Sequence, residues 1–213
     1  MKIGIIGAGK LGTVLGQLAL KAGYQVLIAG SAAPEKIELT VAVLLPGAVA
    51  VTTQQAARQA DLIILALPLS HYQQLDKTDF AGKVVIDATN YWQPTDGLLA
   101  EILHPGLTSS QQIQRHLADS QIIKALNHIG YHELLEAARP QGAPDRKAIA
   151  IAGDQPTALA IVKQFVDSLG FDPLVIGPLV QGKLLQPGSP AFGADVTKAE
   201  LKAILATYAD KIG

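Results

Sequence analysis

The sequence predicts an α/β fold of the doubly wound type, in which a mainly parallel sheet carries helices on both faces. Three observations support this prediction. Short apolar runs recur along most of the 213-residue chain, and segments with helical spacing lie between them. The runs are apolar throughout rather than alternating with polar residues, which is typical of parallel strands covered on both faces.

The expected strands share this continuous apolar character. They are Ile3–Ile6, Gln25–Ala29, Val49–Val51, Leu62–Leu67, Val84–Asp87, Ile122–Ala125, Ala148–Ala152 and Leu174–Ile176.

The expected helices show apolar residues at helical spacing. In the first, one apolar face runs from Leu11 to Ala22, and Gly23 follows as a natural stop. The others are Gln54–Ala60, Gln111–Leu117, Pro156–Leu169 and Thr197–Ile212.

A turn-rich segment, residues 139–144, marks a possible boundary. We expect residues 1–138 to form one domain, with the Rossmann-like sheet described above, and residues 139–213 to form an extension that is not independent. In this arrangement the C-terminal strands continue the same sheet and the C-terminal helices close it. The last helix could pack internally or against a second copy, and a homodimer is the expected assembly because two-fold dimers are the commonest oligomers.

The composition excludes several classes of protein. The chain is 49% hydrophobic and 16% charged, which suits a folded domain with a sizeable core. The net charge of −1 and the lack of a basic stripe give no indication of a nucleic-acid partner. With no cysteine, no signal-peptide pattern and no membrane-length apolar run, we expect a soluble cytoplasmic protein without a membrane partner.

The motif that carries chemistry follows the first expected strand directly. Its residues are Gly7, Ala8, Gly9, Lys10, Leu11 and Gly12, a G-x-G-x-x-G pattern that an amphipathic helix continues. In a Rossmann dinucleotide site the first glycine permits the tight turn, the second leaves room for the pyrophosphate, and the third lets the helix approach the strand. The N–H groups and dipole at the start of the helix then favour the phosphates.

The end of the second expected strand indicates which dinucleotide binds. NAD sites usually place an acidic residue there to bind the ribose 2′-hydroxyl, but the first acidic residue after Gly12 is Glu35. The strand ends instead at Gly30-Ser31, and Lys36 follows. A hydroxyl and a lysine favour the 2′-phosphate, so we expect NADP.

Several further motifs occur in the same order as in one known group. They are Leu65-Ala66-Leu67-Pro68, Asp87-Ala88-Thr89-Asn90, Lys124-Ala125-Leu126-Asn127, Ala152-Gly153-Asp154, Leu169-Gly170-Phe171-Asp172-Pro173 and Gly177-Pro178-Leu179. Together with the glycine motif and the Gly30-Ser31…Lys36 segment, they make nearly the whole chain resemble the NADP-dependent coenzyme F420 reductases and the related reductase domain of the STEAP ferric reductases.

The resemblance implies roles for particular residues. Ser31 and Lys36 match positions that hold the 2′-phosphate, although Ala32 stands where the family often has arginine. Leu67 and Pro68 match a turn that lies along the cofactor. Residues 127–129 match the segment facing the nicotinamide, which makes Asn127 and His128 the candidates for the environment of the reacting ring and Ile129 a cofactor contact.

Other polar and aromatic residues have two possible roles each. Thr89 and Asn90 follow an expected strand and could bind the cofactor or cap local backbone groups. Asp87 is more typical of a backbone cap. Of the pair Tyr91-Trp92, one ring could stack on an acceptor, although core packing is the commoner fate of a tryptophan. His128 and His132 lie four apart, but Gly130 between them and the lack of a third ligand argue against a metal site.

The main functional hypothesis is an NADP(H)-dependent oxidoreductase that transfers a hydride between NADPH and a flavin-like or deazaflavin acceptor, with F420, FMN and FAD as candidates. Two alternatives remain. One is a reductase of a small imine or carbonyl compound, similar to pyrroline-carboxylate reductases, which need a helical C-terminal dimerisation domain. The other is a non-catalytic NADP-binding sensor module.

Overall fold

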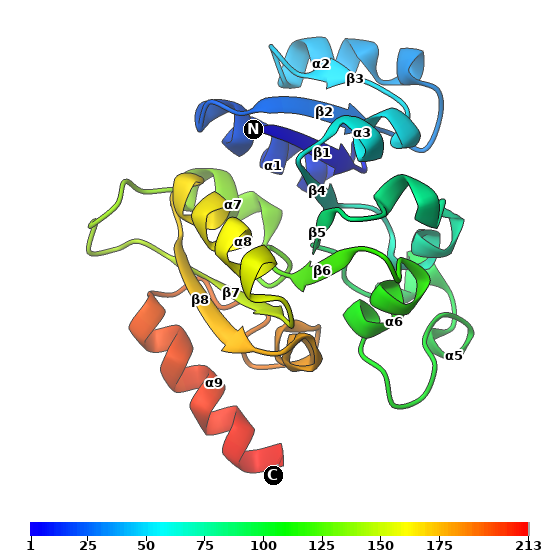
Figure 1. Ribbon diagram of the computed structural model, residues 1–213. Coiled ribbons are helices and arrows are strands. Elements are labelled where there is room, and N and C mark those ends of the chain that lie inside the picture. Colours follow the sequence, from blue (N-terminus) through cyan, green and yellow to red (C-terminus); the bar gives the residue numbers. More distant parts are fainter. Residues whose placement is uncertain (213) are drawn as a thin grey trace.

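The computed structural model describes residues 1–212, and in this part of the chain eight strands form a single sheet (Figure 1). Their order across the sheet is β3-β2-β1-β4-β5-β6-β7-β8. The strands are β1 (Lys2–Ile6), β2 (Gln25–Ala29), β3 (Val49–Ala50), β4 (Leu62–Leu65), β5 (Val84–Asp87), β6 (Gln121–Lys124), β7 (Ala148–Gly153) and β8 (Asp172–Gly177).

The strand order changes direction at β1: β2 and β3 lie on one side of it, and β4 and the later strands lie on the other. Strand β1 pairs in parallel with β2 on one side and with β4 on the other, and every neighbouring pair is parallel except β6 and β7. The carboxyl ends of β1 and β4 therefore lie at a topological switch point, which is where open α/β sheets bind their ligands.

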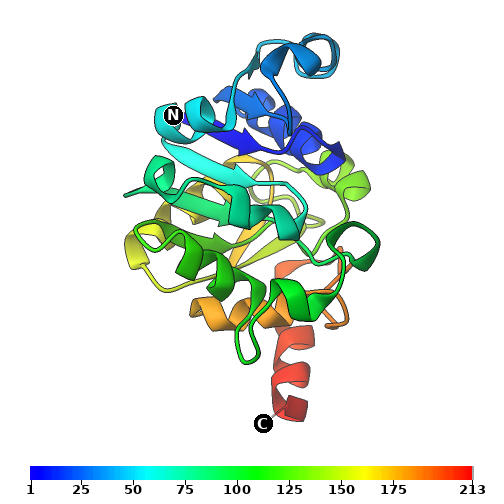
Figure 2. The same cartoon turned by 90° about the vertical axis from the view of Figure 1, so that its right-hand side faces the viewer.

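Helices cover both faces of the sheet, as Figure 2 shows. The α-helices are α1 (Lys10–Lys21), α2 (Glu38–Leu44), α3 (Thr53–Gln59), α4 (Gln93–Asp96), α5 (Leu99–Ile102), α6 (Ser109–His116), α7 (Tyr131–Ala137), α8 (Pro156–Ser168) and α9 (Lys198–Ile212). Short 3-10 segments also occur, namely η1 (Pro34–Lys36), η2 (Leu69–Gln74), η3 (Lys77–Phe80) and η4 (Leu179–Leu185).

Two large apolar clusters fill the space between these layers. One lies under α1, α7 and α8 and joins early residues such as Ile5 to late ones such as Ile151 and Phe165. The other lies on the opposite face under α3, η2 and α6. Because the strands contribute apolar side chains to both faces, their sequences read as continuous apolar runs.

The C-terminal strands extend the same sheet, as the sequence predicted. Strand β7 pairs antiparallel with β6, where Ile123 lies opposite Gly153, and β8 then pairs in parallel with β7. Helix α9 buries Leu201 and Leu205 in a third apolar cluster with β7 and η4. Through Leu201, Leu205 and Tyr208 this helix therefore packs within the chain.

All eight expected strands and all five expected helices are present, with ends shifted by one or two residues. Helices α2, α4, α5 and α7 and the 3-10 segments were not expected from the sequence. Helices α4 and α5 have four residues each, so they are too short to show an apolar period.

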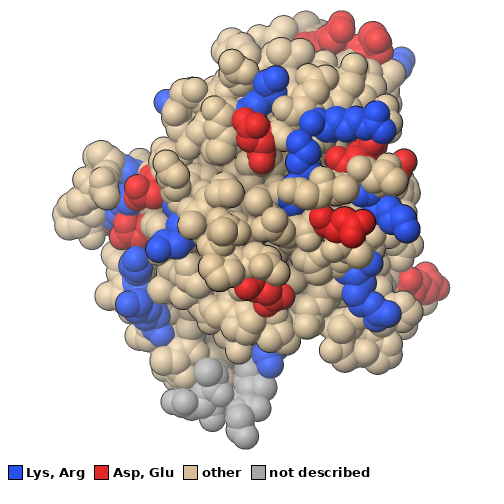
Figure 3. All heavy atoms as spheres, viewed as in Figure 1, with Lys and Arg blue, Asp and Glu red and all other residues tan. Residues whose placement is uncertain are grey.

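Helices α2 and α9 lie at opposite ends of the molecule in Figures 1 and 2. On the face drawn in Figure 3, basic and acidic side chains are interspersed and no stripe of one sign is visible. Among the residues that the structure describes, no helix combines the length and apolar character needed to cross a bilayer.

Candidate cofactor and acceptor site

The glycine motif forms the turn between β1 and α1. Gly7 has φ +123°, a conformation that side-chain-bearing residues rarely adopt, and a Cβ at this position would overlap the carbonyl oxygen of Ala66. A Cβ on Gly12 would overlap the carbonyl oxygen of Gly7. The first and third glycines are therefore required by the packing of β1, β4 and α1 against one another.

The second glycine differs from the other two. Gly9 is the N-cap of α1, and within the described chain no atom lies within 4 Å of where its Cβ would be and no side chain caps the helix. No acidic residue lies in the first turn. The N–H groups at the start of this 12-residue helix are thus available to an anion, and the space beside Gly9 lets one approach.

Ala8, Lys10 and Leu11 complete the motif. A Cβ on Gly30, at the end of β2, would lie 3.9 Å from the Cβ of Ala8, so the loop meets the end of β2. Leu11 packs against the core under α1. Lys10 is exposed, and its Nζ lies 5.6 Å from the centre of the Tyr131 ring on α7, a cation–π geometry that keeps its charge beside the loop.

The candidate 2′-phosphate residues follow β2. Ser31 comes directly after Gly30, and Lys36 ends the 3-10 segment η1; both are exposed. Leu67 and Pro68 lie across the loop, after β4. Because Ala66 donates its N–H to Ile6 (2.8 Å), this turn starts beside the first glycine.

Asn90 and Asn127 join the carboxyl ends of β5 and β6. The amide nitrogen of Asn127 donates to the side-chain oxygen of Asn90 (2.9 Å) and to the carbonyl of Leu185 (2.7 Å), and the amide nitrogen of Asn90 donates to the carbonyl of Asn127 (2.8 Å). Since these partners can only accept, the orientation of the Asn127 amide is determined. Its Oδ1 is buried and has no hydrogen-bond partner among the described residues.

A buried ion pair lies beneath these asparagines. Lys124 Nζ lies 3.2 Å from Asp87 Oδ2 and also donates to the carbonyl of Thr89, and both ionic side chains are fully buried. Asp87 accepts from the backbone (2.9 Å) and hydroxyl (2.7 Å) of Thr89 and from the hydroxyl of Ser110 (2.7 Å). Burial lowers the pKa of Lys124, and the charge of Asp87 opposes that shift.

This network explains two of the motifs found in the sequence. Asp87, Thr89 and Asn90 belong to one motif, and Lys124 and Asn127 belong to the other. Lys124 contacts Asp87 and Thr89, and Asn127 contacts Asn90. Asp87 caps backbone as expected, and the Thr89 hydroxyl is already used by that carboxylate, which leaves Asn90 as the half-buried member of its pair.

His128 and Ile129 lie in the interior rather than on the cleft surface. His128 is 1% exposed and its Nε2 accepts a hydrogen bond from the N–H of Ala150 (3.0 Å). Burial lowers the pKa of His128 to about 4, and the nearby backbone of Ala191 opposes this effect. The turn at Leu126, which has φ +63°, directs the chain into the core at this point.

His132 points elsewhere. It lies exposed on α7 with its ring centre 3.9 Å from that of Tyr131. Among the described residues, no group of three or more His, Asp or Glu side chains is arranged to hold a metal ion.

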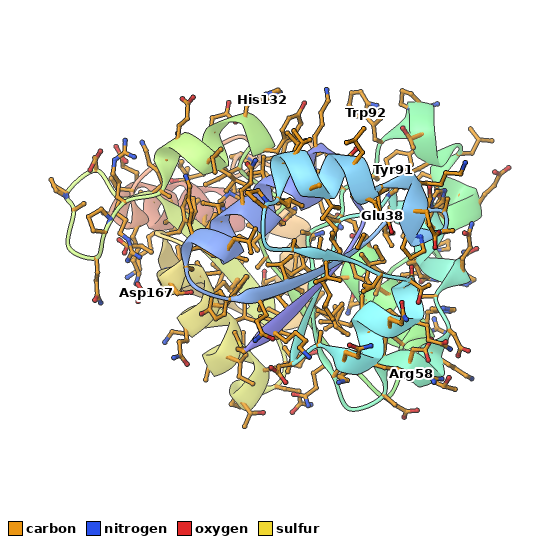
Figure 4. All side chains as sticks on the ribbon, turned by 90° about the horizontal axis from the view of Figure 1, so that it is seen from above. Glu38, Arg58, Tyr91, Trp92, His132 and Asp167 are labelled. Atoms are coloured by element: carbon orange, nitrogen blue, oxygen red, sulfur yellow. The ribbon has the colours of Figure 1, made fainter. Side chains whose placement is uncertain are left out.

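The segment after β5 places an aromatic pair beside Asn90. Figure 4 shows Trp92 and His132 along one edge of the molecule and Tyr91 further in, all three away from Arg58 and Asp167. Trp92 is 65% exposed, so core packing, the commoner fate of a tryptophan, is the wrong interpretation here. Sequence reasoning missed Asp96, whose carboxylate accepts from the N–H groups of Ser70 (2.9 Å) and Trp92 (2.7 Å). No motif marks this residue, because its partners are backbone groups.

Two hollows stand out on the surface. One of about 560 Å³ starts at Ala8 and Gly9 and runs over α1 between α2 and α7. The other, of about 750 Å³, lies between α8, β8 and α9, and none of the candidate site residues lines it. The first is continuous with the glycine loop, and of the candidate site residues it is lined by Ala8, Gly9 and Lys10.

Comparison with known proteins agrees with this geometry. Residues 2–91 match the family described as NADP oxidoreductase, coenzyme F420-dependent. The chain is 27% identical over 185 residues to the rat metalloreductase STEAP3, a match that covers 85% of this chain and 35% of that protein. It is 36% identical over 56 residues to protein YjhV of Escherichia coli, covering 26% of this chain and 41% of that one. The chain thus spans well under half the length of these two relatives.

Similar solved structures share the fold. Protein SMa0349 of Sinorhizobium meliloti has a TM-score of 0.78 and 24% identity, with 93% of this chain and 95% of that one covered. An Arthrobacter protein proposed to be an F420-dependent NADP reductase has a TM-score of 0.70 and 21% identity, covering 86% and 87%. The 1-pyrroline-5-carboxylate reductase of Streptococcus pyogenes has a TM-score of 0.61 and 18% identity, covering 100% and 71%.

The fold and the glycine loop are those of Rossmann-type dinucleotide-binding folds. More particularly, residues 2–91 match the F420-dependent NADP oxidoreductase family, in agreement with the resemblance that the motifs indicated.

Proposed function

We propose that the protein transfers a hydride between NADPH and a planar flavin-like or deazaflavin acceptor, with F420, FMN and FAD as candidates. The observation that carries the proposal is the uncapped start of α1 at Gly9, with open space beside it and the exposed charge of Lys10 next to it. These features suit the pyrophosphate of a dinucleotide. When bound, the nicotinamide supplies the hydride, that is, one proton and two electrons, and becomes NADP⁺ as the acceptor ring is reduced.

Three groups of residues would contact three parts of the dinucleotide. Residues 7–12 would hold the pyrophosphate, and Ser31 and Lys36 would contact the 2′-phosphate from the end of β2. Leu67 and Pro68 would lie along the nicotinamide half. With Ala32 instead of arginine beside Ser31, we expect a modest rather than strict preference for NADP over NAD.

Asn127 would orient the nicotinamide end. Its buried Oδ1 has no partner among the described residues, and a buried acceptor left without a donor is unfavourable by about 1–3 kcal/mol. An amide N–H or ribose hydroxyl from the cofactor would satisfy it. Asn90 would hold Asn127 in place through their reciprocal hydrogen bonds. The roles first assigned to His128, Ile129 and the Thr89 hydroxyl become supporting ones, since these groups are buried and packed within the protein.

The test is a binding titration followed by turnover. NADPH and NADH are titrated into the purified protein, and F420, FMN or FAD is then added to the NADPH complex while NADPH absorbance is followed. We expect tighter binding of NADPH and its oxidation by one of these acceptors. Binding of NADPH without oxidation by any of them would contradict the proposal.

The 2′-phosphate assignment has a matched pair of variants. Lys36→Ala removes the charge next to the β2 end, whereas Lys21→Ala removes an exposed lysine in the last turn of α1, at the other end of that helix. Loss of one phosphate contact at an exposed lysine is expected to weaken NADPH binding about 5-fold and leave NADH binding unchanged. Equal effects of the two variants would exclude Lys36 from the site.

The alternatives give different outcomes in the same assays. NADPH consumption driven by an imine or carbonyl compound, with no redox cofactor present, would favour a reductase like the pyrroline-carboxylate enzymes. Tight nucleotide binding without turnover would favour a sensor module. For the assembly we propose a cytoplasmic homodimer, tested by light scattering; because α9 buries its apolar face within the chain, the contact would use another surface.

A further inference from the structure

We propose that the indole ring of Trp92 is the stacking surface for the planar ring of the hydride acceptor, and this inference rests on the proposed function. In the bound state one face of the acceptor ring would lie against the nicotinamide and the other against the indole. Nothing in the family match assigns a role to this residue, since that match ends at residue 91.

The first observation is the exposure of the ring. Trp92 is 65% exposed, although tryptophan carries a large apolar surface that is usually buried for most of its area. Leu98 and Leu99, at the start of α5, are 59% and 46% exposed. Large apolar side chains exposed in this way are typical of a place where a ligand or partner binds.

The second observation is that the backbone under the ring is fixed. The N–H of Trp92 donates to Asp96 Oδ2 (2.7 Å), and the other oxygen of this buried carboxylate accepts from Ser70 (2.9 Å). The hydroxyl of Tyr91 donates to the carbonyl of Gly97 (2.7 Å). Hydrogen bonds therefore join the two ends of α4 to each other, and Asp96 joins this segment to Ser70 after β4. Because this backbone is already ordered, only the side-chain torsions of Trp92 lose freedom when the ring binds a ligand.

The third observation is position. Trp92 lies two residues after Asn90, whose amide group exchanges hydrogen bonds with Asn127 at the carboxyl ends of β5 and β6. The unpartnered Oδ1 of Asn127 belongs to this pair. In Figure 4 Trp92 lies on the same edge of the molecule as His132, which follows the β6 loop. Trp92 thus follows closely after the pair of residues that we assign to the nicotinamide end of the cofactor site.

The size of the ring fits the acceptor class. Hydride transfer to a flavin or deazaflavin requires the two reacting rings to be stacked closely and held in register, and it needs no strong acid or base. A bicyclic indole offers a flat face to a tricyclic ring, and aromatic stacking of this kind is tolerant of the polar groups at the ring edge.

Trp92 also provides its own assay, because it is the only tryptophan of the chain. FMN and F420 are titrated separately into the full-length protein, with and without NADPH, while tryptophan fluorescence is recorded. Stacking on the indole is expected to quench this fluorescence saturably. In Trp92→Leu, acceptor binding is followed by the fluorescence of the acceptor itself, and its dissociation constant is expected to rise about 10-fold. Trp92→Phe should recover most of that loss, and the dissociation constant for NADPH should stay within about 2-fold of the original in both variants.

Two controls separate stacking from a general apolar contact. Leu98→Ala removes a neighbouring exposed side chain, and Ile161→Ala removes one of 38% exposure on the outer face of α8. Both are expected to leave acceptor affinity within about 2-fold, since neither offers an aromatic face. An equal loss in Leu98→Ala and Trp92→Leu, without rescue by phenylalanine, would indicate an apolar docking patch and overturn the proposal.

The remaining outcomes distinguish this proposal from the function on which it rests. Saturable quenching by FMN or F420 without oxidation of NADPH would support the stacking role and contradict hydride transfer. NADPH oxidation by an acceptor that neither quenches Trp92 nor responds to Trp92→Leu would support the function and overturn the stacking role. Absence of both effects would overturn both.

Discussion

At the scale of single residues, Lys124 shows how a motif can serve the site without touching a ligand. Its ammonium group is fully buried and is held by Asp87 and by the carbonyl of Thr89. Removing one member of a buried ion pair leaves the other charge uncompensated. The pair therefore fixes the backbone from which Asn90 and Asn127 project.

The first prediction concerns this pair. Lys124→Met should reduce the free energy of unfolding by about 3–5 kcal/mol, because the Asp87 carboxylate stays buried without its counter-charge. The double variant Asp87→Asn/Lys124→Met should recover part of the loss, since it removes the unpaired charge. Urea unfolding measures both. A single variant as stable as the original protein would show that the pair contributes nothing.

The second prediction concerns His128 and pH. Its pKa is lowered from 6.5 to about 4 in the folded protein, so between these pH values the unfolded chain binds a proton that the folded chain does not. Stability is therefore present above pH 6.5 and is lost as pH falls toward 4, by up to about 3 kcal/mol. His128→Gln keeps an acceptor for Ala150 and removes the titration, so its unfolding free energy should change less over this range. Identical pH profiles would contradict the assignment.

The residue scale also shows where sequence reasoning succeeds. The glycines, Asp87 and Asn90 could be placed because strand ends meet at one edge of a parallel sheet. His128 could not, because the left-handed turn at Leu126 and the packing of the C-terminal segment take it into the core. Asp96 could not either, since its partners are backbone N–H groups brought together only by the fold.

At the scale of elements, the long helices α1, α8 and α9 were predictable from their apolar spacing, whereas α4 and α5, with four residues each, show no such spacing. The β1–α1 turn is the element on which the site depends most. Gly7 and Gly12 are required because a Cβ there would overlap backbone atoms, whereas Gly9 leaves open space, and this difference can be tested.

The third prediction compares two glycines of that turn. Gly12→Ala should lower the free energy of unfolding. The added Cβ would overlap the carbonyl oxygen of Gly7, which is backbone and cannot move aside as a side chain could. Gly9→Ala should change stability by no more than about 1 kcal/mol, since its φ of −80° suits alanine and, in the described chain, no atom lies within 4 Å of the added carbon. It should nevertheless weaken NADPH binding strongly, because the methyl group would occupy the space proposed for the pyrophosphate. Thermal unfolding and NADPH titration measure the two effects, and unaltered binding by Gly9→Ala would contradict the site.

At the scale of the whole molecule, the segment after residue 138 shares the sheet and the main apolar cluster with the residues before it. Strand β7 pairs with β6, and Ile149, Ile151 and Phe165 belong to the same apolar cluster as Ile5 and Ile123. The site depends on this segment too: Leu185 accepts from the amide of Asn127, and Gly193 donates its N–H to the carbonyl of His128 (2.6 Å). That residues 139–213 are not independent stays a prediction, and these contacts support it.

The last prediction follows from these shared contacts. The full chain should unfold in one cooperative transition, with the same midpoint by circular dichroism and by Trp92 fluorescence. A fragment of residues 1–138 should lack that transition and should not bind NADPH, although it contains every residue proposed to contact the cofactor, because β6 and the apolar face under α1 and α7 would lie open to water. Adding residues 139–213 as a separate chain tests whether the interface alone restores binding. A fragment that folds cooperatively and binds NADPH on its own would make residues 1–138 an independent domain, and the contacts of Asn127 with Leu185 and of His128 with Ala150 would then be dispensable for the site.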